Sequence, residues 1–437
     1  MTDRSVESTG GTPPVEDGTR SKSPRVASRR HRDASARPEV PASKDVDLPV
    51  SQTPRRRALD VPIRPTRAEI DLRALARNVS AIRALAPRAE ILAVVKANAY
   101  GHGAVPIAQA LENERVKMLG VALIEEGVEL RNAGIRSPIL VLGGSYEGGY
   151  DLMVAHRLTP TVFRPEHLKG FAQAAKRAGS PVSVHLKVDS GMGRLGVLPK
   201  DLDAFLDLAG KFREVQIDGL LSHFASADLE NRDFTLAQVR CFKDAHARML
   251  ARGLRPSWRH LSNSAGVIDL PEVRDGLELN MVRPGIMLYG LHPAAWLQKA
   301  TGLHPVLTWK TAIIHLKTVA EGTPISYGST WRAPRESVIA TLPIGYADGY
   351  SRRYSNRAQV LVRGRRASVV GRVCMDMSMV DVTDIPAACV GDEVVLLGAQ
   401  GRERIPAEEL AELAGTIHYE IICAVGARVP RVVQSAT

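Results

Sequence analysis

The sequence predicts an α/β fold, a (β/α)8 TIM-type barrel, followed by a C-terminal all-β domain. Eight short apolar runs have the composition of buried parallel strands, and helical segments lie between most of them. After about residue 303 the pattern changes to short strands separated by Gly, Asp and Pro turns. A doubly wound sheet is the rival architecture, but the G-x-G-x-x-G signature expected after its first strand is missing.

Each barrel strand is predicted from an apolar run bounded by turn residues. The eight runs are residues 91–95, 118–122, 138–142, 158–162, 182–188, 217–222, 258–262 and 281–289. With their helices they cover about 235 residues, which agrees with the usual barrel length of about 250.

The helices and the second domain are predicted from periodicity in the same way. Asp71 is expected to cap a helix whose Leu75, Val79 and Ile82 recur at helical spacing. Residues 202–212 and 235–251 are further predicted helices. The later strands are predicted at residues 311–319, 338–342, 359–362, 368–373, 379–382 and 393–397, and one helix at residues 407–413.

We expect three parts: a tail at residues 1–62, the barrel at 63–304 and the β domain at 305–437. The chain has 437 residues and a net charge of +11, and its first 67 residues contain 14 Lys and Arg against 9 Asp and Glu. The tail is rich in Ser, Pro, Arg and Gly, so it cannot bury enough surface to offset its ordering entropy. We expect it to be disordered. No basic helix or aromatic-interleaved basic patch follows, which favours a solvated tail over binding to nucleic acid.

The cysteines and the apolar runs bound the class of protein further. Four widely spaced cysteines without a C-x-x-C pair indicate neither a zinc site nor a disulfide framework, and they suit a reducing cytosol. No apolar run approaches the roughly 18 residues of a membrane span. The arginine pairs near the N-terminus have no apolar stretch after them, so we expect no twin-arginine export signal. These patterns favour a cytoplasmic protein without a metal site.

The clearest chemical signal is the segment 93–103, Ala-Val-Val-Lys-Ala-Asn-Ala-Tyr-Gly-His-Gly, at the end of the first predicted strand. A lysine at the exit of a buried strand is partly desolvated, which lowers its pKa and frees the amine to attack a carbonyl. Lys96 is therefore a candidate Schiff-base lysine. A lysine that merely extends its charge out of a strand end is the alternative interpretation.

Unusual polar residues also follow four other strands. In a (β/α)8 barrel the active site lies at the carboxyl ends of the strands. Besides Lys96, the predicted strand ends carry the segments 187–194, 222–224, 260–266 and 280–286, which contain Lys, Asp, Ser, His, Asn and Arg. One such strand end is often structural, but five that converge on one mouth predict an active site.

Together these strings resemble the alanine racemases, from about residue 69 to residue 431. The resemblance continues through the β domain in the segments 325–328, 344–349, 373–376 and 416–420. It implies a barrel that binds pyridoxal 5'-phosphate (PLP), followed by a β domain, and a reaction that interconverts L-alanine and D-alanine. It also implies at least a homodimer whose active sites are shared between subunits, and a role in supplying D-alanine, for peptidoglycan.

The resemblance assigns the two bases. Lys96 would bind the cofactor and act on the D-enantiomer, and Tyr327, given by the partner subunit, would act on the L-enantiomer from the opposite face. A free phenol has a pKa near 10 and is a poor base alone. His223 and Arg283 together resemble the relay that polarises this phenol in the family.

Arg283 resembles the residue that faces the pyridine nitrogen of the cofactor. Many PLP enzymes place a carboxylate there, which keeps the nitrogen protonated and makes the ring a strong electron sink. Because an arginine cannot accept that proton, the ring nitrogen should stay unprotonated and the sink should be weaker. A phosphate contact or a surface salt bridge is the alternative interpretation of Arg283.

The remaining site residues are carried over from the same strings. Those that would bind the cofactor, besides Lys96, His223 and Arg283, are Tyr100, Asn263, Ser264, Gly285, Ile286 and Tyr419. Arg194 and Met375 would hold the substrate carboxylate, and Tyr346 and Asp228 would lie at the substrate entry. Lys187 matches a position that is often carbamylated, and a plain ion pair with a carboxylate is its alternative.

Three other functions compete with this assignment. A broad-specificity or serine racemase would use the same chemistry and differ only near Tyr419 and Met375. An amino-acid decarboxylase of similar architecture places a Glu where Arg283 stands. A PLP carrier with this barrel lacks the β domain and would leave Tyr327 without a purpose. We expect the alanine racemase.

Overall fold

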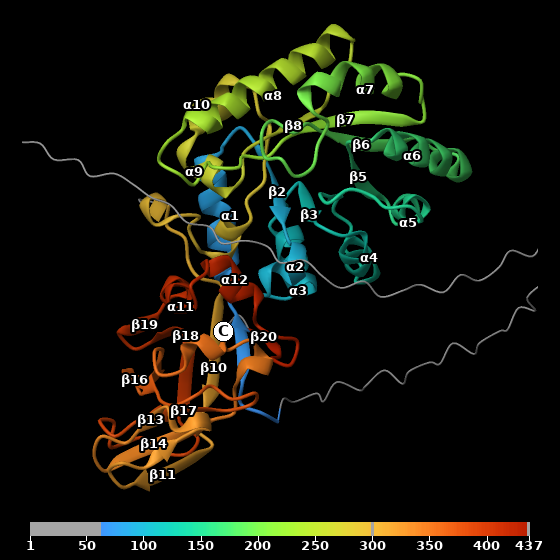
Figure 1. The fold of residues 1–437 in the computed structure, drawn as a ribbon. Helices are drawn as coiled ribbons and strands as arrows, with labels where there is room; N and C mark the ends of the chain where they lie inside the picture. The colour runs from blue at the N-terminus through green and yellow to red at the C-terminus, as the bar shows by residue number, and fades with distance from the viewer. Residues whose placement is uncertain (1–62, 299–300, 435–437) are drawn as a thin grey trace, which may run out of the picture. The chain divides into compact units, whose positions relative to one another are not determined.

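The computed structural model describes residues 63–298 and 301–434. The tail expected at residues 1–62 lies outside the described residues. Eight parallel strands form one sheet (Figure 1). β2 to β8 lie side by side in chain order, and the last strand, β9, lies on the other side of β2. They are β2 (Glu90–Val94), β3 (Met118–Val121), β4 (Ile139–Val141), β5 (Leu158–Val162), β6 (Val182–Lys187), β7 (Val215–Leu221), β8 (Trp258–His260) and β9 (Met281–Val282).

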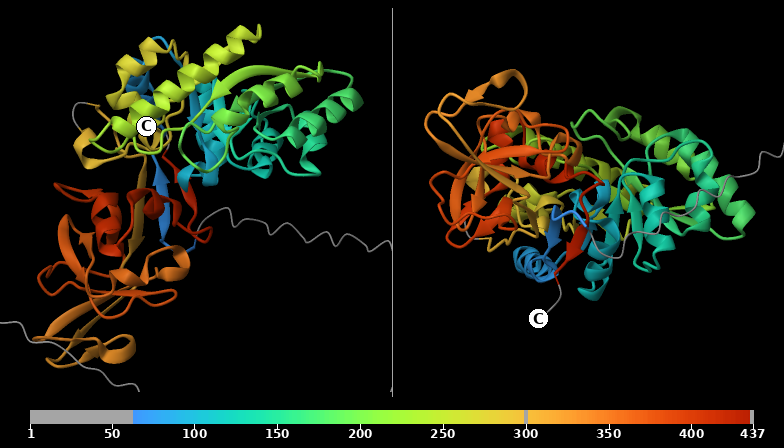
Figure 2. Two further views of the ribbon diagram at one scale, coloured as in Figure 1. Left: turned by 45° about the horizontal axis from the view of Figure 1, so that its top comes forward. Right: turned by 90° about the horizontal axis from the view of Figure 1, so that it is seen from below.

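The sheet nearly closes into the predicted barrel. The Arg283 N–H just after β9 donates to the Ser262 carbonyl just after β8 at 2.9 Å, which brings the two ends of the sheet together. Most of its strand residues are buried, as expected for parallel strands covered on both faces. Figures 1 and 2 show the helices that flank this sheet.

The helices follow from the apolar periodicity of the sequence. Asp71 caps α1 as predicted, because its carboxylate accepts the N–H groups of Arg73 at 2.8 Å and Ala74 at 2.9 Å. The flanking helices are α1 (Leu72–Leu85), α3 (Ala104–Asn113), α4 (Ile124–Asn132), α5 (Gly149–Ala155), α6 (Pro165–Ala178), α7 (Leu202–Ala209), α8 (Asp233–Ala251), α9 (Ser264–Asp269) and α10 (Pro271–Gly276). None of the helices in residues 63–298 and 301–434 is both long and apolar enough to cross a membrane.

The last barrel strand is shorter than predicted. The expected strand 281–289 ends at Val282, and Ile286–Tyr289 form a 3-10 turn instead. Pro284 has no N–H to give to a strand ladder, and the N–H of Gly285 donates to the Ser264 side chain at 3.0 Å. The chain therefore leaves the sheet at the point where it enters the cavity described below.

The second sheet has ten strands and is antiparallel apart from one pair. Its central path is β11-β14-β17-β16-β15-β18-β10-β1-β20, and β19 pairs with β18. The strands are β1 (Arg67–Ile70), β10 (Leu307–Ala312), β11 (His315–Val319), β14 (Ser337–Leu342), β15 (Gln359–Val362), β16 (Arg365–Val369), β17 (Ser378–Asp381), β18 (Glu393–Gln400), β19 (Glu403–Ile405) and β20 (Arg431–Val433). A separate small hairpin joins β12 (Pro324–Ile325) to β13 (Trp331–Arg332).

The N-terminal strand corrects the expected start of the barrel. β1 lies between β10 and β20 in the second sheet, so the barrel sheet does not begin at residue 63. Ala68 and Ile70 are buried there, and Glu69 pairs with Lys310 at 2.9 Å. The structure also divides the predicted strand 311–319 between β10 and β11.

The second domain contains the predicted helix at residues 407–413 as α11 (Ala407–Ala414) and one helix that was not predicted. This is α12 (His418–Cys423), whose aromatic and branched residues resemble a strand locally. It packs so closely on the turn after Lys96 that a Cβ on Gly101 would lie 2.1 Å from the Ile422 carbonyl oxygen. α12 thereby carries Tyr419 to the carboxyl ends of the barrel strands.

Candidate active site

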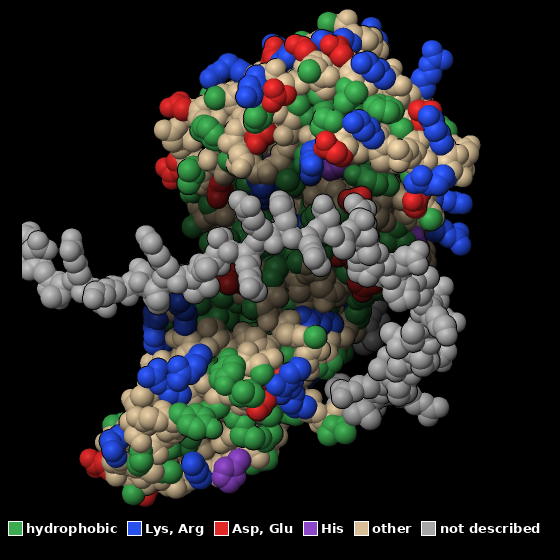
Figure 3. Space-filling model, turned by 45° about the vertical axis from the view of Figure 1, so that its right-hand side comes forward, with side chains coloured by type: hydrophobic (Ala, Val, Ile, Leu, Met, Phe, Trp, Pro, Cys, Tyr) green, Lys and Arg blue, Asp and Glu red, His purple; other side chains and the backbone are tan. Residues whose placement is uncertain are grey.

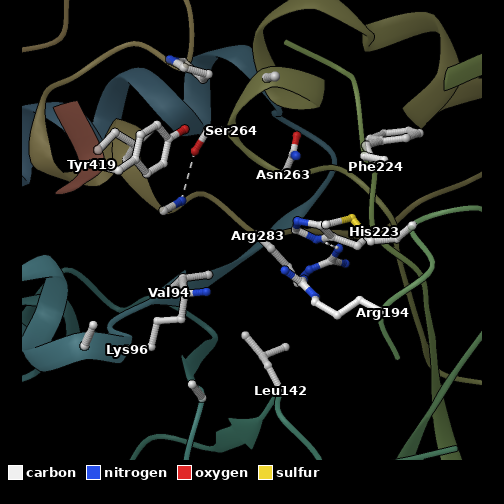
Figure 4. Close-up of a pocket in the computed structure, with 18 of the residues that line it drawn as sticks. Val94, Lys96, Leu142, Arg194, His223, Phe224, Asn263, Ser264, Arg283 and Tyr419 are labelled. Atoms are coloured by element: carbon white, nitrogen blue, oxygen red, sulfur yellow. Dashed lines mark hydrogen bonds between the residues drawn. The ribbon is translucent and has the colours of Figure 1, made fainter. Parts of the chain in front are cut away.

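A cavity of about 700 Å³ lies at the carboxyl ends of the barrel strands (Figure 4). The structure brings twelve of the predicted site residues together in its wall. They are Lys96, Tyr100, Lys187, Arg194, His223, Asp228, Asn263, Ser264, Arg283, Gly285, Ile286 and Tyr419. No cluster of three or more His, Cys, Asp or Glu suited to a metal ion occurs among the described residues.

Lys96 lies two residues beyond the end of β2 and projects toward the same space as Arg194 and Arg283 (Figure 4). Burial is the largest influence on its amine and lowers its pKa, and the charge of Arg194 lowers the pKa further. Glu126 acts in the opposite direction. A lysine with a lowered pKa supplies the neutral amine that Schiff-base chemistry needs.

The turn after Lys96 is left-handed over four consecutive residues that are not glycine. Ala97, Asn98, Ala99 and Tyr100 have φ of 53°, 53°, 54° and 52°, and Gly101 continues at 83°. For an L-residue this conformation costs roughly 1–2 kcal/mol each. The strained residues directly follow Lys96. Local backbone strain of this kind is commonly found at functional sites.

Arg283 is held beneath the cavity by five hydrogen bonds and is only 4% exposed. One terminal nitrogen donates to the His260 carbonyl at 2.7 Å and to His260 Nδ1 at 3.0 Å. The other donates to the carbonyls of Ser222 at 2.5 Å and Leu261 at 3.0 Å, and to His223 Nδ1 at 3.2 Å. Within residues 63–298 and 301–434 no acceptor takes the Nε–H of Arg283, so that donor is left for a group bound in the cavity.

These hydrogen bonds determine which ring nitrogen carries the proton in three histidines. Because a guanidinium only donates, His260 Nδ1 and His223 Nδ1 must accept, and each ring carries its proton on Nε2. His260 Nε2 then donates to His185 Nδ1 at 2.9 Å. Burial, followed by the charge of Arg283, lowers the pKa of His223 and His260 well below the ordinary value. The network is a chain of neutral imidazoles around one buried cation.

No site role was predicted for His185 or His260 from the sequence. A usable signal existed for His185, because it stands two residues before Lys187 in β6 and alternate strand residues face the same side. His260 lies inside a segment that the sequence singled out, but nothing local pointed to its contact with Arg283. That contact depends on the nearness of β8 and β9.

We expect the buried histidines to make the protein less stable in acid. Burial lowers the pKa of His102, His167 and His185 from 6.5 to about 4. Between about pH 6.5 and pH 4 the unfolded chain binds protons that the folded chain does not. The free energy of unfolding should therefore fall as the pH falls, by up to about 1.4 kcal/mol per pH unit for each histidine.

Urea unfolding across this pH range measures the slope. His185→Phe should flatten it by about one histidine's share, whereas His315→Asn, at an exposed histidine, should leave it unchanged. An equal slope in the wild type and in His185→Phe would contradict this account of His185.

Lys187 is 6% exposed and has no carboxylate partner within the described residues. Burial, and then the charges of Arg283 and Arg194, lower its pKa to about 8. The charge of Asp189 raises the pKa of Lys187, while the Asp189 carboxylate accepts the N–H groups of Gly191 at 2.9 Å and Gly193 at 3.1 Å.

A group of hydrogen-bond donors forms another part of the cavity wall. The Gly285 N–H and the Ser264 hydroxyl lie 3.0 Å apart (Figure 4), and a Cβ on Gly285 would come within 2.5 Å of the Tyr100 hydroxyl. Burial raises the pKa of Tyr100 and Tyr419 far above the ordinary value, so both hydroxyls stay protonated and able to donate. Such donors suit a phosphate dianion that approaches the backbone closely.

Tyr327, Met375 and Tyr346 do not line this cavity. Tyr327 and Met375 are 72% and 53% exposed and line a second, open hollow of about 560 Å³ on the second domain. Tyr346 is 42% exposed and lines neither hollow. Figure 3 shows hydrophobic side chains exposed on the second domain, the lower part of that view.

The fold and the cavity together define a class of enzyme. A barrel lysine with a lowered pKa, a donor set for a phosphate and a buried arginine with a free donor fit PLP, and this combination defines a PLP-dependent enzyme.

Comparison with known proteins identifies the family. The family model "Alanine racemase, N-terminal domain" matches residues 70–293, and "Alanine racemase, C-terminal domain" matches residues 306–433. The alanine racemase of Halothermothrix orenii is 48% identical over 369 residues, covering 84% of this chain and 96% of that protein. That of Sorangium cellulosum is 46% identical over 380 residues, covering 84% and 99%. The chain belongs to the alanine racemase family.

Solved structures agree with this assignment. Alanine racemase from Streptomyces lavendulae matches with a TM-score of 0.81 at 38% identity, covering 86% of this chain and 99% of that chain. The Bacillus anthracis enzyme with bound L-Ala-P has a TM-score of 0.80 at 37% identity, covering 86% and 96%. The Bartonella henselae enzyme with covalently bound pyridoxal phosphate has a TM-score of 0.76 at 28% identity, covering 85% and 100%. The reaction of this chain is the interconversion of L-alanine and D-alanine.

Proposed function

We propose that two copies of this chain form a homodimer and that each active site uses Lys96 of one subunit and Tyr327 of the other. The observation that carries this proposal is the position of Tyr327. The cavity that contains Lys96 has no contribution from Tyr327 or Met375 of its own chain, and both are exposed on the second domain. A racemase needs a base on each face of the substrate, and a partner's second domain supplies the missing one.

The residues divide the work as follows. Arg194 binds the substrate carboxylate, together with the Met375 backbone N–H of the partner. When bound, PLP would supply the electron sink for the pair left at Cα once the Cα proton is removed. The neutral Lys96 amine takes that proton from one enantiomer. Tyr327 acts at the opposite face, polarised by the Nε2–H that His223 keeps because Arg283 donates to its Nδ1.

The cofactor is held by the donors around it. Tyr100, Tyr419, Ser264 and the backbone N–H groups of Gly285 and Ile286 would bind the phosphate, for which the Gly285 N–H would exchange its present acceptor, the Ser264 hydroxyl. Asn263 caps α9 and so supports Ser264, the first residue of that helix. Arg283 would offer its free Nε–H to the ring nitrogen of PLP, and as a guanidinium cation it has no proton-accepting atom. A weakly polarised ring limits side reactions. Asp228 in the cavity wall and Tyr346 on the partner's surface line the substrate entry.

We propose that Lys187 carries a carbamate, which would turn this buried cation into an anion that orients Arg194. The neutral amine adds CO2, and a pKa of about 8 gives Lys187 a far larger neutral fraction near neutral pH than an ordinary lysine. Carbon-13 NMR with labelled bicarbonate should give one carbamate resonance, absent in Lys187→Arg and present in Lys169→Ala. A spectrum without any Lys187-dependent resonance would contradict it.

Mixing two impaired variants tests the shared site. Lys96→Ala and Tyr327→Phe subunits, unfolded and refolded together, form hybrid dimers in which one of the two sites has both bases intact. Half of the dimers are hybrids, so activity should return to roughly a quarter of the wild-type value. Mixtures that stay as inactive as the separate variants would contradict a shared site, and active monomers at any dilution would contradict the dimer.

The proposed setting is the cytoplasm, where D-alanine supplies peptidoglycan synthesis. The four cysteines, Cys241, Cys374, Cys389 and Cys423, are all free, which agrees with a reducing compartment.

A further inference from the structure

The carboxylate of Glu126 joins two segments that meet beside the cavity. Glu126 is the third residue of α4, and its Oε2 accepts the N–H groups of Ala122 at 2.7 Å and Leu123 at 3.1 Å. Its Oε1 accepts the N–H of Ala97 at 2.6 Å. Ala97 directly follows Lys96 and is the first residue of the left-handed turn. One carboxylate therefore ties the start of a helix to the lysine turn.

The turn needs such ties because its conformation is unfavourable for residues other than glycine. The Asn98 side chain fixes the turn from within by accepting the Ala104 N–H at 2.7 Å, and the close packing of Gly101 on α12 fixes its far end. At its near end the Ala97 N–H has Glu126 as its acceptor. Lys96 and Tyr100 stand at the two ends of the turn, so a shift of the turn moves both.

A carboxylate suits this position better than a neutral amide. Three N–H donors share two oxygens, and glutamine offers one acceptor oxygen and an NH2 group that only donates. Glutamine would have to face its NH2 group toward either Ala97 or the start of α4. Glu126 also places a negative charge near the Lys96 amine, which otherwise faces the cation of Arg194.

We propose that Glu126 is a positioning residue of the racemase site, which holds the left-handed turn and thereby aims Lys96 and Tyr100 into the cavity. This inference rests on the proposed function, in which Lys96 carries the cofactor and Tyr100 binds its phosphate. A residue that only capped α4 would satisfy Ala122 and Leu123 and have no influence on the turn.

The test compares the holoenzymes of the wild type, Glu126→Gln and Glu125→Gln. Glu125 is the exposed neighbour on the same helix and serves as the matched control. Hydrogen–deuterium exchange of residues 97–103 reports the turn. Release of PLP on dialysis, with the remaining lysine-bound cofactor trapped by borohydride, reports Lys96. Glu126→Gln should accelerate both by about tenfold, the effect of losing one charge-assisted hydrogen bond, and Glu125→Gln should match the wild type.

Faster exchange confined to residues 122–124, with wild-type PLP release, would overturn the proposal and leave Glu126 as a helix cap. Should Glu126→Gln fail to fold, the wild type alone decides. The proposal predicts that the Ala97 amide of the wild type exchanges slowly although Ala97 is exposed, because Glu126 accepts its N–H. Rapid exchange of that amide overturns the proposal. Borohydride labelling of a lysine other than Lys96 in the wild type would instead refute the proposed function, which keeps the two failures distinct.

Discussion

Lys96→Ala should lose the lysine-bound cofactor and nearly all racemisation. The purified variant should show no visible absorbance from a lysine-bound cofactor, and borohydride should fix no PLP to the chain. Loss of both the attachment point and one of the two bases should lower kcat by at least about 10³-fold. Absorbance spectroscopy and peptide mapping after reduction measure the first effect, and chiral chromatography measures the second.

Lys169→Ala is the matched control for this substitution, because Lys169 is an exposed lysine on the same barrel. It should keep the wild-type spectrum and rate. A borohydride-sensitive band that survives in Lys96→Ala would refute the assignment of the cofactor lysine.

Tyr327→Phe should separate the two faces of the reaction. Loss of the phenol removes the proposed base for L-alanine, so exchange of its Cα proton in D₂O should fall by about 10²–10⁴-fold. Lys96 can still remove the Cα proton of D-alanine and return a deuteron to the same face. Exchange of D-alanine with retained configuration should therefore persist, while racemisation is slow from either enantiomer because the final proton cannot be delivered.

Proton NMR of each enantiomer, with chiral analysis of the product, measures this asymmetry. Tyr146→Phe, at an exposed tyrosine of the barrel, should behave as the wild type. Equal losses of exchange from L-alanine and D-alanine would remove Tyr327 from its role as the second base.

Much of the fold was predictable because its signals are local. The eight barrel strands start within two residues of the predicted positions, since buried parallel strands are continuous apolar runs. β1 could not be placed in the second sheet, because its partners β10 and β20 are more than 200 residues away in sequence. α12 was missed because a six-residue segment of aromatic and branched residues has no helical period to detect.

The cavity was predictable for a related reason. In a parallel barrel the strand ends meet at one mouth, so residues spread from Lys96 to Gly285 converge without any knowledge of their contacts. The support beneath the cavity was not predictable in this way. His185 reaches Arg283 through His260, and Glu126 reaches Ala97 from the next helix, and both contacts depend on tertiary neighbours.

The most direct test of the whole account follows L-alanine in D₂O with the purified enzyme and added PLP, by proton NMR together with chiral chromatography. L-serine, L-lysine and L-arginine are run in parallel. The account predicts loss of the Cα–H signal of L-alanine as D-alanine appears, with little change in the other three. Comparable turnover of serine or the basic amino acids would contradict a dedicated alanine racemase. Absence of exchange in the presence of bound, reducible PLP would contradict the racemase assignment itself.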